Sequence, residues 1–348
     1  MTTRHPLPRS IVCLLLVAIS GTSGRSETLY VDIRTGNDGN PATRNEPLKS
    51  LERAAVLVNG RAGSGYAIII VGAGLYSLSH PVTFAGSRTF TEQDRLTIRA
   101  SILPDDPQWR PDLMPVLASV ENPSRPPAPG RPSETYSLKV QTSHVTIQGL
   151  KFLGNPLAYN WHCCIERIGE HLDDLLVTQC VFAGNRDTSD IYCAALATGD
   201  RFIVDHCTFS GCHACTVFWD GADGVGGQHC AMRYCIVRNA RISAVWTCQT
   251  ADDLEFYHNI VGDSEYLWMR KPGDRQTYRI EDCVAVDNRC FSGYGVASGP
   301  TGQTGPEVTF ERSNVITEGD LAFVPTLPLR VAQDSVGANL GAGLFRTR

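Results

Sequence analysis

The chain has 348 residues, of which 42% are apolar and 19% are charged, and its formal net charge is -5. This composition can fill a large core and excludes a globally disordered chain. Lysine and arginine are scattered along the sequence without forming a basic stripe, so we expect no nucleic-acid partner.

The first 26 residues have the features of a secretory signal peptide. Arg4 and Arg9 precede an apolar run over residues 11–19, and small residues lead to a cleavage region near residues 24–26. This run is too short to cross a membrane and no later stretch is long enough, so we expect no membrane span. The mature protein is therefore predicted to be secreted, periplasmic or held at the cell surface.

Residues 27–60 predict a strand followed by a capping helix. Residues 29–33 alternate like a strand, and a row of turn-forming residues follows from Gly36 to Pro41. A helix is then expected to open at Pro47 and to stop at Gly60. Its apolar positions fall on one face at helical spacing: Leu48, Leu51, Ala54, Ala55 and Val58. Such a helix can cover the open end of a stack of strands.

Residues 61–144 are interpreted as the first coils of that stack. Residues 67–71 read as a buried strand, 74–84 as a strand, a turn and a strand, and 96–100 as another short strand. Proline and charge then accumulate over residues 103–132, which indicates a surface excursion loop and argues against a central strand there. One short apolar run, residues 114–120, interrupts this loop.

A short pattern recurs seven times between residues 145 and 320. Each copy has an alternating apolar run, a polar pair and a second apolar run, and the copies are spaced 31, 27, 28, 24, 24 and 31 residues apart. Aligned, they place seven residues in one column: Gly149, Cys180, Cys207, Cys235, Asn259, Cys283 and Asn314. Asn and Gly tolerate the left-handed geometry of a tight bend, and a small Cys can fill the same inward position.

Three short strands for each repeat predict an all-β right-handed parallel β-helix of about seven or more coils. An antiparallel β-sandwich is the alternative, although hairpin signals such as Asn-Gly are absent between the runs. Residues 321–348 contain two prolines and several glycines, and we expect this tail to lie along or over the last coil.

The sequence resembles the pectate-lyase-like superfamily of right-handed parallel β-helix proteins. The similarity lies in the opening Tyr30-Val31-Asp32 and Gly36-Asn37-Asp38, in the coil bends at Asn259 and Asn314, and in the ending 334–342. This resemblance covers nearly all of the mature chain and implies the fold. The fold hosts lyases, glycoside hydrolases, epimerases, esterases and adhesive proteins, so it does not imply one reaction.

In enzymes that resemble this chain, the substrate groove follows the third strand of each coil. Strict alternation along that strand, with Val217, Val245, Leu267 and Met269 inward, would direct another set of side chains outward. That set is Phe218, Asp220, Trp246, Trp268 and Arg270. Phe218, Trp246 and Trp268 are then the predicted substrate-binding residues, because aromatic faces cover the apolar faces of sugar rings.

The predicted partner is thus an extracellular polysaccharide, and Asp220, Arg270, Lys271 and Glu166 are the candidate catalytic residues. Lys271 or Arg270 would abstract a proton in a lyase, whereas Glu166 and Asp220 would be acid and base in a hydrolase. The alternative function is a non-catalytic surface or adhesive module that binds carbohydrate on the same face.

Twelve cysteines remain after residue 26, all between Cys163 and Cys290, and an exported chain meets conditions in which disulfides persist. Disulfides are therefore expected, although spacing does not give the pairing. No metal site is predicted: only Cys212 and Cys215 have zinc-pair spacing. No cofactor is expected, and the turn at residues 220–224 is the one place where oxygen ligands could hold Ca²⁺. We expect a monomer.

Overall fold

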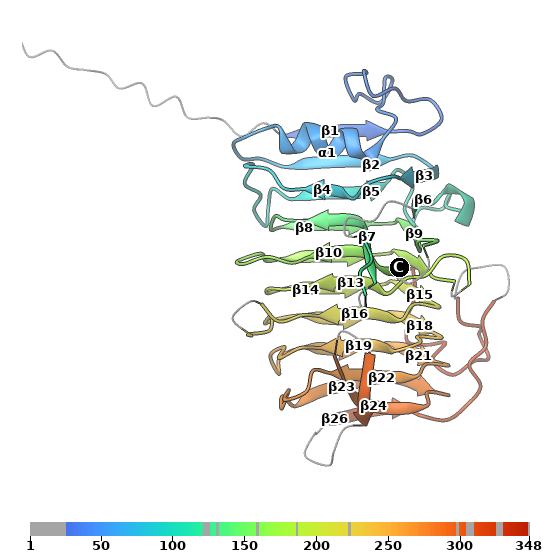
Figure 1. Cartoon of the computed structure of the whole chain (residues 1–348). Helices are drawn as coiled ribbons and strands as arrows, with labels where there is room; N and C mark the ends of the chain where they lie inside the picture. The colour runs from blue at the N-terminus through green and yellow to red at the C-terminus, as the bar shows by residue number, and fades with distance from the viewer. Residues whose placement is uncertain are drawn as a thin grey trace, which may run out of the picture.

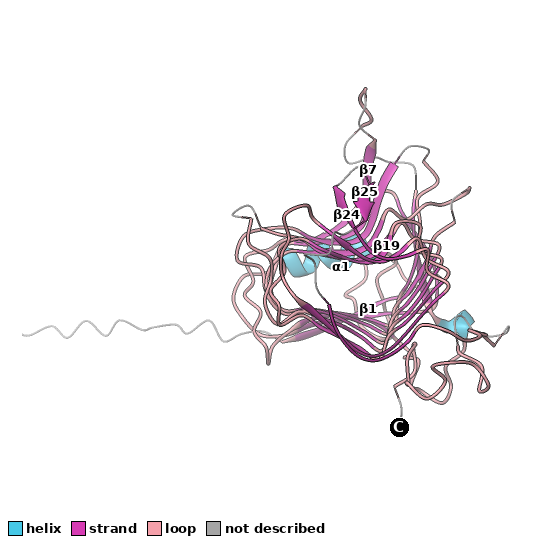
Figure 2. Ribbon diagram, turned by 90° about the horizontal axis from the view of Figure 1, so that it is seen from below, coloured by secondary structure: helices cyan, strands magenta, loops and turns pink. Residues whose placement is uncertain are grey.

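The computed structural model describes residues 26–120, 126–129, 132–157, 160–185, 187–221, 224–296, 299–303, 310–324 and 330–346. These residues form a right-handed parallel β-helix, in which short strands stack coil upon coil (Figure 1). Viewed along its axis, the stack has two facing sheets joined by loops (Figure 2). The predicted fold class is confirmed.

One sheet has seventeen strands and the other has nine. Two strands of each regular coil belong to the larger sheet and one to the smaller, and every neighbouring pair of coils is in parallel register. The larger sheet contains β1 (Glu27–Val31), β2 (Ala67–Val71), β3 (Gly74–Leu78), β5 (Leu96–Ala100), β6 (Pro115–Ser119), β8 (Val145–Gln148), β9 (Lys151–Leu153), β11 (Leu175–Thr178), β12 (Val181–Ala183), β14 (Phe202–Asp205), β15 (Thr208–Ser210), β17 (Ala231–Arg233), β18 (Ile236–Arg238), β20 (Glu255–Tyr257), β21 (Ile260–Gly262), β23 (Tyr278–Val286) and β26 (Phe310–Ile316).

The smaller sheet faces it across the core. Its strands are β4 (Val82–Phe84), β7 (Ser133–Val140), β10 (Asn160–Arg167), β13 (Cys193–Ala197), β16 (Ala214–Phe218), β19 (Ser243–Thr247), β22 (Tyr266–Arg270), β24 (Cys290–Val296) and β25 (Gly299–Gln303). All of their pairings are parallel except that of β24 with β25. Strands β7 and β10 have eight residues each, whereas β13, β16, β19 and β22 have five.

The predicted capping helix is confirmed as α1 (Leu51–Asn59), which lies at the end of the stack beside β1 (Figure 1). It begins four residues later than Pro47, because Ser50 is the N-cap and its Oγ accepts a hydrogen bond from Arg53 N at 3.1 Å. It ends at Gly60, as expected. The predicted apolar face is buried and closes this end of the core.

The seventeen-stranded sheet bends at one left-handed residue in each of seven coils, from Gly149 to Asn314. The residues of this bend column are Gly149, Gln179, His206, Tyr234, His258, Asp282 and Asn314, with φ between 49° and 74°. Six of the seven are not glycine, although the left-handed region is unfavourable for residues with a Cβ. Their side chains lie outside the core, where His206 and Tyr234 stack with ring centroids 4.7 Å apart.

The residue after each bend points into the core, and these residues form an inner ladder: Leu150, Cys180, Cys207, Cys235, Asn259, Cys283 and Val315. Asn259 Oδ1 accepts from Cys235 N at 2.9 Å, and its Nδ2 donates to Met232 O at 2.7 Å. The five central members of the predicted column are confirmed. Its two ends were placed one residue early, because Gly149 and Asn314 occupy the left-handed bend itself.

Strand β6 corrects the expected excursion loop. Residues 115–119 pair in parallel with both β3 and β9, and Leu117 is fully buried. The exclusion of a central strand from residues 103–132 was therefore wrong at this apolar run. The proline that opens β6 takes a strand's first position, where proline is tolerated.

The C-terminal segment lies along the last coils, where Val336 packs against Ile260 and Val284, in keeping with the expected tail along or over the last coil. It then continues further back along the stack than expected (Figure 1). Leu344 packs against Trp109 and Val181, and its carbonyl accepts from Gln179 Nε2 at 2.9 Å. The backbone N–H of Arg346 donates to Asp105 Oδ1 at 2.9 Å. The expected signal peptide lies outside the described residues apart from Ser26. Within the described part, no helix is long and apolar enough to cross a membrane.

Candidate functional site

A groove lies on the outer face of the nine-stranded sheet and has a volume of about 440 Å³. Fourteen described residues line it: Glu134, Tyr136, Lys139, Gln141, Trp161, Cys163, Glu166, Ile168, Tyr192, Cys193, Leu196, Val217, Trp219 and Trp246. They come from β7, β10, β13, β16 and β19 and from the turns that flank these strands. The groove therefore crosses five successive strands, as a site for an extended ligand would.

One side of the groove is built by the additional residues of β7 and β10. The first halves of these two strands carry Glu134, Tyr136 and Trp161, and no other strand of the sheet extends beside them. Seen along the axis, β7 projects beyond the sheet on the same side as β24 and β25 (Figure 2). Between these projections, Cys163, Cys193, Leu196 and Val217 belong to an apolar cluster that is separate from the core.

Aromatic rings gather at two places in this groove. Trp161 and Tyr192 are 5.4 Å apart between ring centroids, and Tyr192 is in turn 5.2 Å from the ring of His213. Trp219 and Trp246 meet edge to face at 6.3 Å. Of the five aromatic residues that line the groove, Trp246 is only 2% exposed. The other four are half-buried and offer surface that suits sugar rings: Tyr136, Trp161, Tyr192 and Trp219.

The predicted alternation fails in this sheet because two successive residues of each strand face the core. Cys164 and Ile165 both belong to the core in β10, as do Ala244 and Val245 in β19. Trp246 was predicted to face outward, and this is confirmed. Phe218 and Trp268 were predicted to face outward and instead lie in the core, so that prediction was wrong.

The same phase error affects other positions. Val217 and Met269 were expected to point inward, yet both belong to the outer apolar cluster. Strict alternation from Val217 would also direct Trp219 inward, but Trp219 lines the groove. Strict alternation of inward and outward residues fails where two successive residues both point inward. Every later residue of that strand then faces the side opposite to the one that alternation predicts.

Arg270 was predicted to face outward, but its side chain is fully buried inside the β-helix. Its Nη2 is 3.4 Å from Asp274 Oδ1, and its guanidinium lies 4.8 Å from the ring centroid of Tyr278. Tyr278 also donates to Asp274 Oδ2 at 2.9 Å. This buried ion pair joins β22 to the turn that follows it, and Arg270 is not among the residues that line the groove.

Asp220 and Lys271 form an ion pair near the end of the groove, and Lys271 is the more exposed partner. The hydrogen bond to Asp220 raises the pKa of Lys271, so this amine is held protonated. A protonated lysine is a poor base, and the geometry therefore opposes proton abstraction by Lys271. Asp220 is engaged with this lysine rather than open to Ca²⁺, and Asp223 of the same turn lies outside the described residues.

Glu166 lies in the groove, as predicted, and pairs with Lys139 of the neighbouring strand at 2.8 Å. The Lys139 amine also lies 4.1 Å from the ring centroid of Tyr136. The Tyr136 hydroxyl donates to Glu134 Oε2 at 3.0 Å. Glu134, Tyr136, Lys139 and Glu166 thus form one connected polar row across β7 and β10.

Buried polar side chains support this side of the groove. His162 Nδ1 is 2.8 Å from Thr135 Oγ1, and Asn160 Nδ2 donates to the same hydroxyl at 2.7 Å. Burial lowers the pKa of His162 to about 4. His162 is therefore neutral at ordinary pH and joins β7 to β10 by hydrogen bonds rather than by charge.

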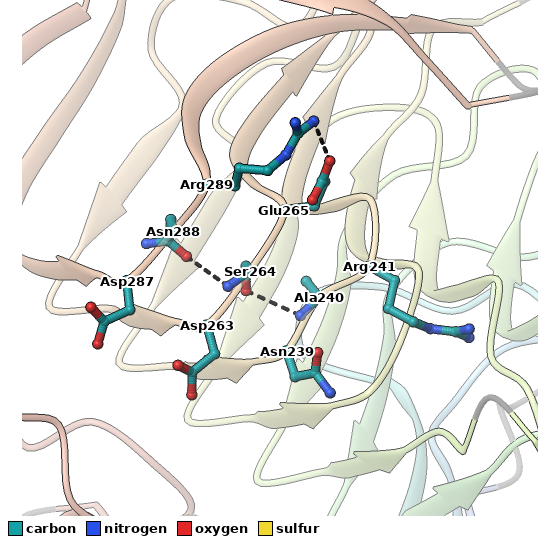
Figure 3. A pocket seen from close by; sticks show the side chains of 9 residues that line it. All are labelled: Asn239, Ala240, Arg241, Asp263, Ser264, Glu265, Asp287, Asn288 and Arg289. Carbon is teal, nitrogen blue, oxygen red and sulfur yellow. Dashed lines mark hydrogen bonds and ion pairs between the residues drawn. The ribbon is translucent and has the colours of Figure 1, made fainter.

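A larger hollow, of about 740 Å³, lies where the turns after β18, β21 and β23 stack (Figure 3). Asn288 Oδ1 accepts from Ser264 N at 3.1 Å, and Ser264 Oγ accepts from Ala240 N at 3.1 Å. Glu265 pairs with Arg289, as Figure 3 shows. No aromatic residue is among those that line it, and its polar groups bond mainly to one another, so it is a structural ladder of turns.

The expected disulfides are not confirmed: the twelve cysteines of the described part are free and buried. Burial raises the pKa of Cys180 and Cys207 well above the usual range, which keeps both thiols protonated and unreactive. Cys212 and Cys215 both belong to the core. Among the described residues, no group of three or more His, Cys, Asp or Glu side chains could hold a metal ion.

Of the residues that line the groove, only Glu166 and Trp246 were predicted from the sequence as site residues. Those missed include Glu134, Tyr136, Lys139, Trp161, Tyr192 and Trp219. The alternation of Ser133 to Val140 is a signal that could have identified β7 and with it Tyr136 and Lys139. Trp161 and Tyr192 precede the expected third strands by only a few residues. No sequence signal reveals that β10 extends far enough to bring Trp161 into the groove.

No family model matches the sequence, and no curated protein matches it. Among solved structures, a pectin methylesterase from Aspergillus niger in deglycosylated form is 12% identical, with a TM-score of 0.52 over 91% of this chain and 96% of that one. A rhamnogalacturonan lyase is 13% identical, with a TM-score of 0.50 over 88% of this chain and 78% of that one. At these identities, the chain is shown to share the parallel β-helix fold of both enzymes.

Proposed function

We propose that this protein binds an extracellular polysaccharide in the groove across β7, β10, β13, β16 and β19. The observation that carries the proposal is the set of half-buried aromatic residues that line the groove together with apolar side chains: Tyr136, Trp161, Tyr192 and Trp219. Sugar rings stack on aromatic faces, and a groove across several strands suits a chain of sugars rather than one unit.

The apolar character of this face supports the proposal further. Leu196, Val217, Trp246 and Met269 follow one another in register on the outer face of the sheet. All four are buried, and the first three also line the groove, so the groove has an apolar base. The two structural neighbours are both named for a polysaccharide, which agrees with this proposal.

The proposed location is outside the cytoplasm, at the cell surface, in the periplasm or in the medium. The signal-peptide pattern over residues 1–26 supports export. The buried, protonated cysteines are compatible with an oxidising compartment, because a thiol that cannot ionise exchanges slowly with disulfides. Cell fractionation of the producing organism, with detection of the mature chain, tests this location directly.

Binding is tested by titrating the purified protein with a panel of polysaccharides and repeating the titration with Trp161→Ala and Trp219→Ala. Each variant should weaken binding about threefold to tenfold, since a stacked ring contributes roughly 0.5–1.5 kcal/mol beyond its buried area. Tyr257→Ala is the matched control, because Tyr257 lies on the other sheet. Unchanged affinity in both tryptophan variants would contradict the proposed groove.

Cleavage is proposed as a further property of the same groove, with Glu166 and Glu134 as the carboxylates that line it. The test incubates the protein with each polysaccharide that binds and measures new reducing ends and absorbance from unsaturated ends. New reducing ends without the absorbance indicate hydrolysis, and both together indicate a lyase. Binding without either product assigns the protein to the non-catalytic, adhesive class.

A further inference from the structure

We propose that the groove binds the end of a glycan chain, because the last two strands of the nine-stranded sheet close the groove beside Trp246. This inference rests on the proposed polysaccharide-binding function and specifies which part of the polymer is bound. It follows from where the groove lining stops, from what packs on the next coil, and from where the half-buried aromatic residues lie.

The groove lining stops at β19, although the outer row of side chains continues. Leu196, Val217 and Trp246 line the groove in successive coils. The next position in this row is Met269 of β22, which is in register with Trp246. Met269 belongs to the outer apolar cluster, yet it is fully buried and lies outside the described set of lining residues. The row therefore passes beneath other parts of the chain after Trp246.

The backbone of β24 packs against the end of this row. A Cβ placed at Gly295 would lie 2.8 Å from Met269 Sδ and 3.2 Å from Trp246 Cζ2, so a glycine allows the strand to approach both side chains closely. Residues 293–296 of this strand then pair antiparallel with residues 299–303 of β25. The two strands form an end hairpin, which projects from the sheet on the same side as β7 when seen along the axis (Figure 2).

The end hairpin gives the groove a closed end. A glycan that continued past Trp246 along the row would have to lift β24 away from Met269 and Trp246. Both apolar side chains would then be exposed to water, which is unfavourable. A glycan that ends at Trp246 leaves these contacts in place. The closed end therefore favours a terminal sugar over an internal one.

The half-buried aromatic residues are arranged to suit this mode of binding. Trp219 follows β16 and meets Trp246 edge to face at 6.3 Å, so it lies in the coil nearest to the closed end. Tyr192 belongs to the coil before it, and Trp161 lies on β10, two coils or about 10 Å away along the axis. Trp219 is thus the platform for the terminal sugar, and Tyr192 and Trp161 contact the sugars that follow it.

The experiment measures how many protein molecules bind each glycan chain. Linear chains of about six and about sixty sugars, prepared from galacturonan, alginate, fructan and pullulan, are titrated into the protein and followed by calorimetry. A protein that binds chain ends should saturate at one molecule per chain at both lengths, because each chain has one end of the recognised kind. The molar affinities at the two lengths should agree within about twofold, whereas an open groove would load several molecules on the long chain.

Trp219→Ala tests whether the chain end is bound in this groove. The substitution should weaken the binding of short and long chains by the same factor, about threefold to tenfold, and leave one protein molecule per chain. Tyr257→Ala is the matched control, because Tyr257 lies on the other sheet, and it should change neither the affinity nor the stoichiometry. Unfolding midpoints of both variants confirm that they are folded.

The outcomes are separable. If the long chain binds several protein molecules, the chain-end inference is overturned while the polysaccharide groove stands. If one molecule binds per chain but Trp219→Ala leaves the affinity unchanged, the chain end is bound elsewhere and the inference is again overturned. If no chain of either length binds the intact protein, the proposed function is overturned and this inference with it. The stoichiometry needs no variant, so a misfolded Trp219→Ala protein would not prevent a decision.

Discussion

The seventeen-stranded sheet bends at a left-handed residue in seven coils, whereas strands β10, β13, β19 and β22 of the nine-stranded sheet each contain two successive inward residues. On the larger sheet, the outer face carries ion pairs such as Arg95 with Asp174 at 2.5 Å and Arg233 with Asp205 at 3.1 Å. On the smaller sheet, the outer face carries a second apolar cluster.

The apolar residues on the outer faces of the two sheets differ in what lies against them. On the larger sheet, Ile260 and Val284 pack against the C-terminal segment, which includes Val336. On the smaller sheet, Leu196 and Val217 line the groove. The larger sheet thus covers apolar residues of its outer face with the chain's own tail, whereas apolar residues of the smaller sheet border a groove.

The largest expected effect is on the free energy of unfolding, and it depends on whether a tryptophan of the smaller sheet lies on the inner or the outer face. Trp268→Ala should lower the free energy of unfolding by about 3–5 kcal/mol, because it removes a fully buried ring and the bond from its Nε1 to Thr247 Oγ1 at 3.0 Å. Trp219→Ala should cost less than about 1.5 kcal/mol, since Trp219 is half-buried in the groove.

Urea unfolding followed by circular dichroism measures both values. Equal losses for the two variants would mean that the inner and outer faces of this sheet are not distinguished as described. Only Trp219→Ala is expected to weaken glycan binding at a temperature where both variants remain folded.

The next effect tests the inner ladder of the larger sheet. Asn259→Ala should cost about 2–3 kcal/mol, because it leaves Cys235 N–H and Met232 C=O buried without their present partners. Cys207→Ala, at the same ladder position in a neighbouring pair of coils, should cost only about 1 kcal/mol, the value of a small buried group. Thermal and urea unfolding provide the comparison, and a Cys207→Ala loss as large as that of Asn259→Ala would refute it.

The smallest expected effect is a pH dependence of stability that comes from His162, which lies beneath one side of the groove. Burial holds the pKa of His162 at about 4, below its value in the unfolded chain, so the unfolded state binds more protons between these two values. Stability should therefore fall as the pH decreases from about 6.5 toward 4, by roughly 1–3 kcal/mol.

His162→Gln should remove this decrease in stability while retaining hydrogen-bonding groups near Thr135.

Asp174 should affect stability at lower pH than His162 does. Burial tends to raise its pKa, but hydrogen bonds from Arg95 and His144 prevail and lower it, so its contribution is lost only as pH falls through that lowered value. Unfolding free energies measured between pH 3 and 7 distinguish the two; a decrease above pH 4 that persists in His162→Gln would contradict the assignment.

The fold was predictable because the same short sequence pattern recurs in successive coils of the larger sheet. Cys180, Cys207 and Cys235 follow a bend residue in every copy, and the spacing between copies exposes the coil length directly. The capping helix was predictable for a similar reason: its apolar face and its Gly60 stop are local signals. The bend position was missed because Gln179, His206 and Tyr234 are not residues that favour left-handed geometry.

The site was less predictable because its geometry depends on contacts between coils. Trp246 and Glu166 were identified, but Phe218, Trp268 and Arg270 were assigned to the wrong face, since one additional inward residue in each strand shifts the alternation. Tyr136 and Lys139 enter the groove only because β7 pairs with β10 in a defined register. A sequence pattern describes one strand at a time and carries no such register.

The returning C-terminal segment changes how the whole stack unfolds. A β-helix whose coils contact only their neighbours can lose coils one by one from an end. Here Arg346 bonds to Asp105, 241 residues earlier, and Leu344 packs on Trp109 while Val336 packs beside the strands of the last coils. The first and last parts of the repeat therefore share one surface, so the loss of an end coil exposes side chains far from it. Because of the returning C-terminal segment, the coils are expected to unfold together as one cooperative unit.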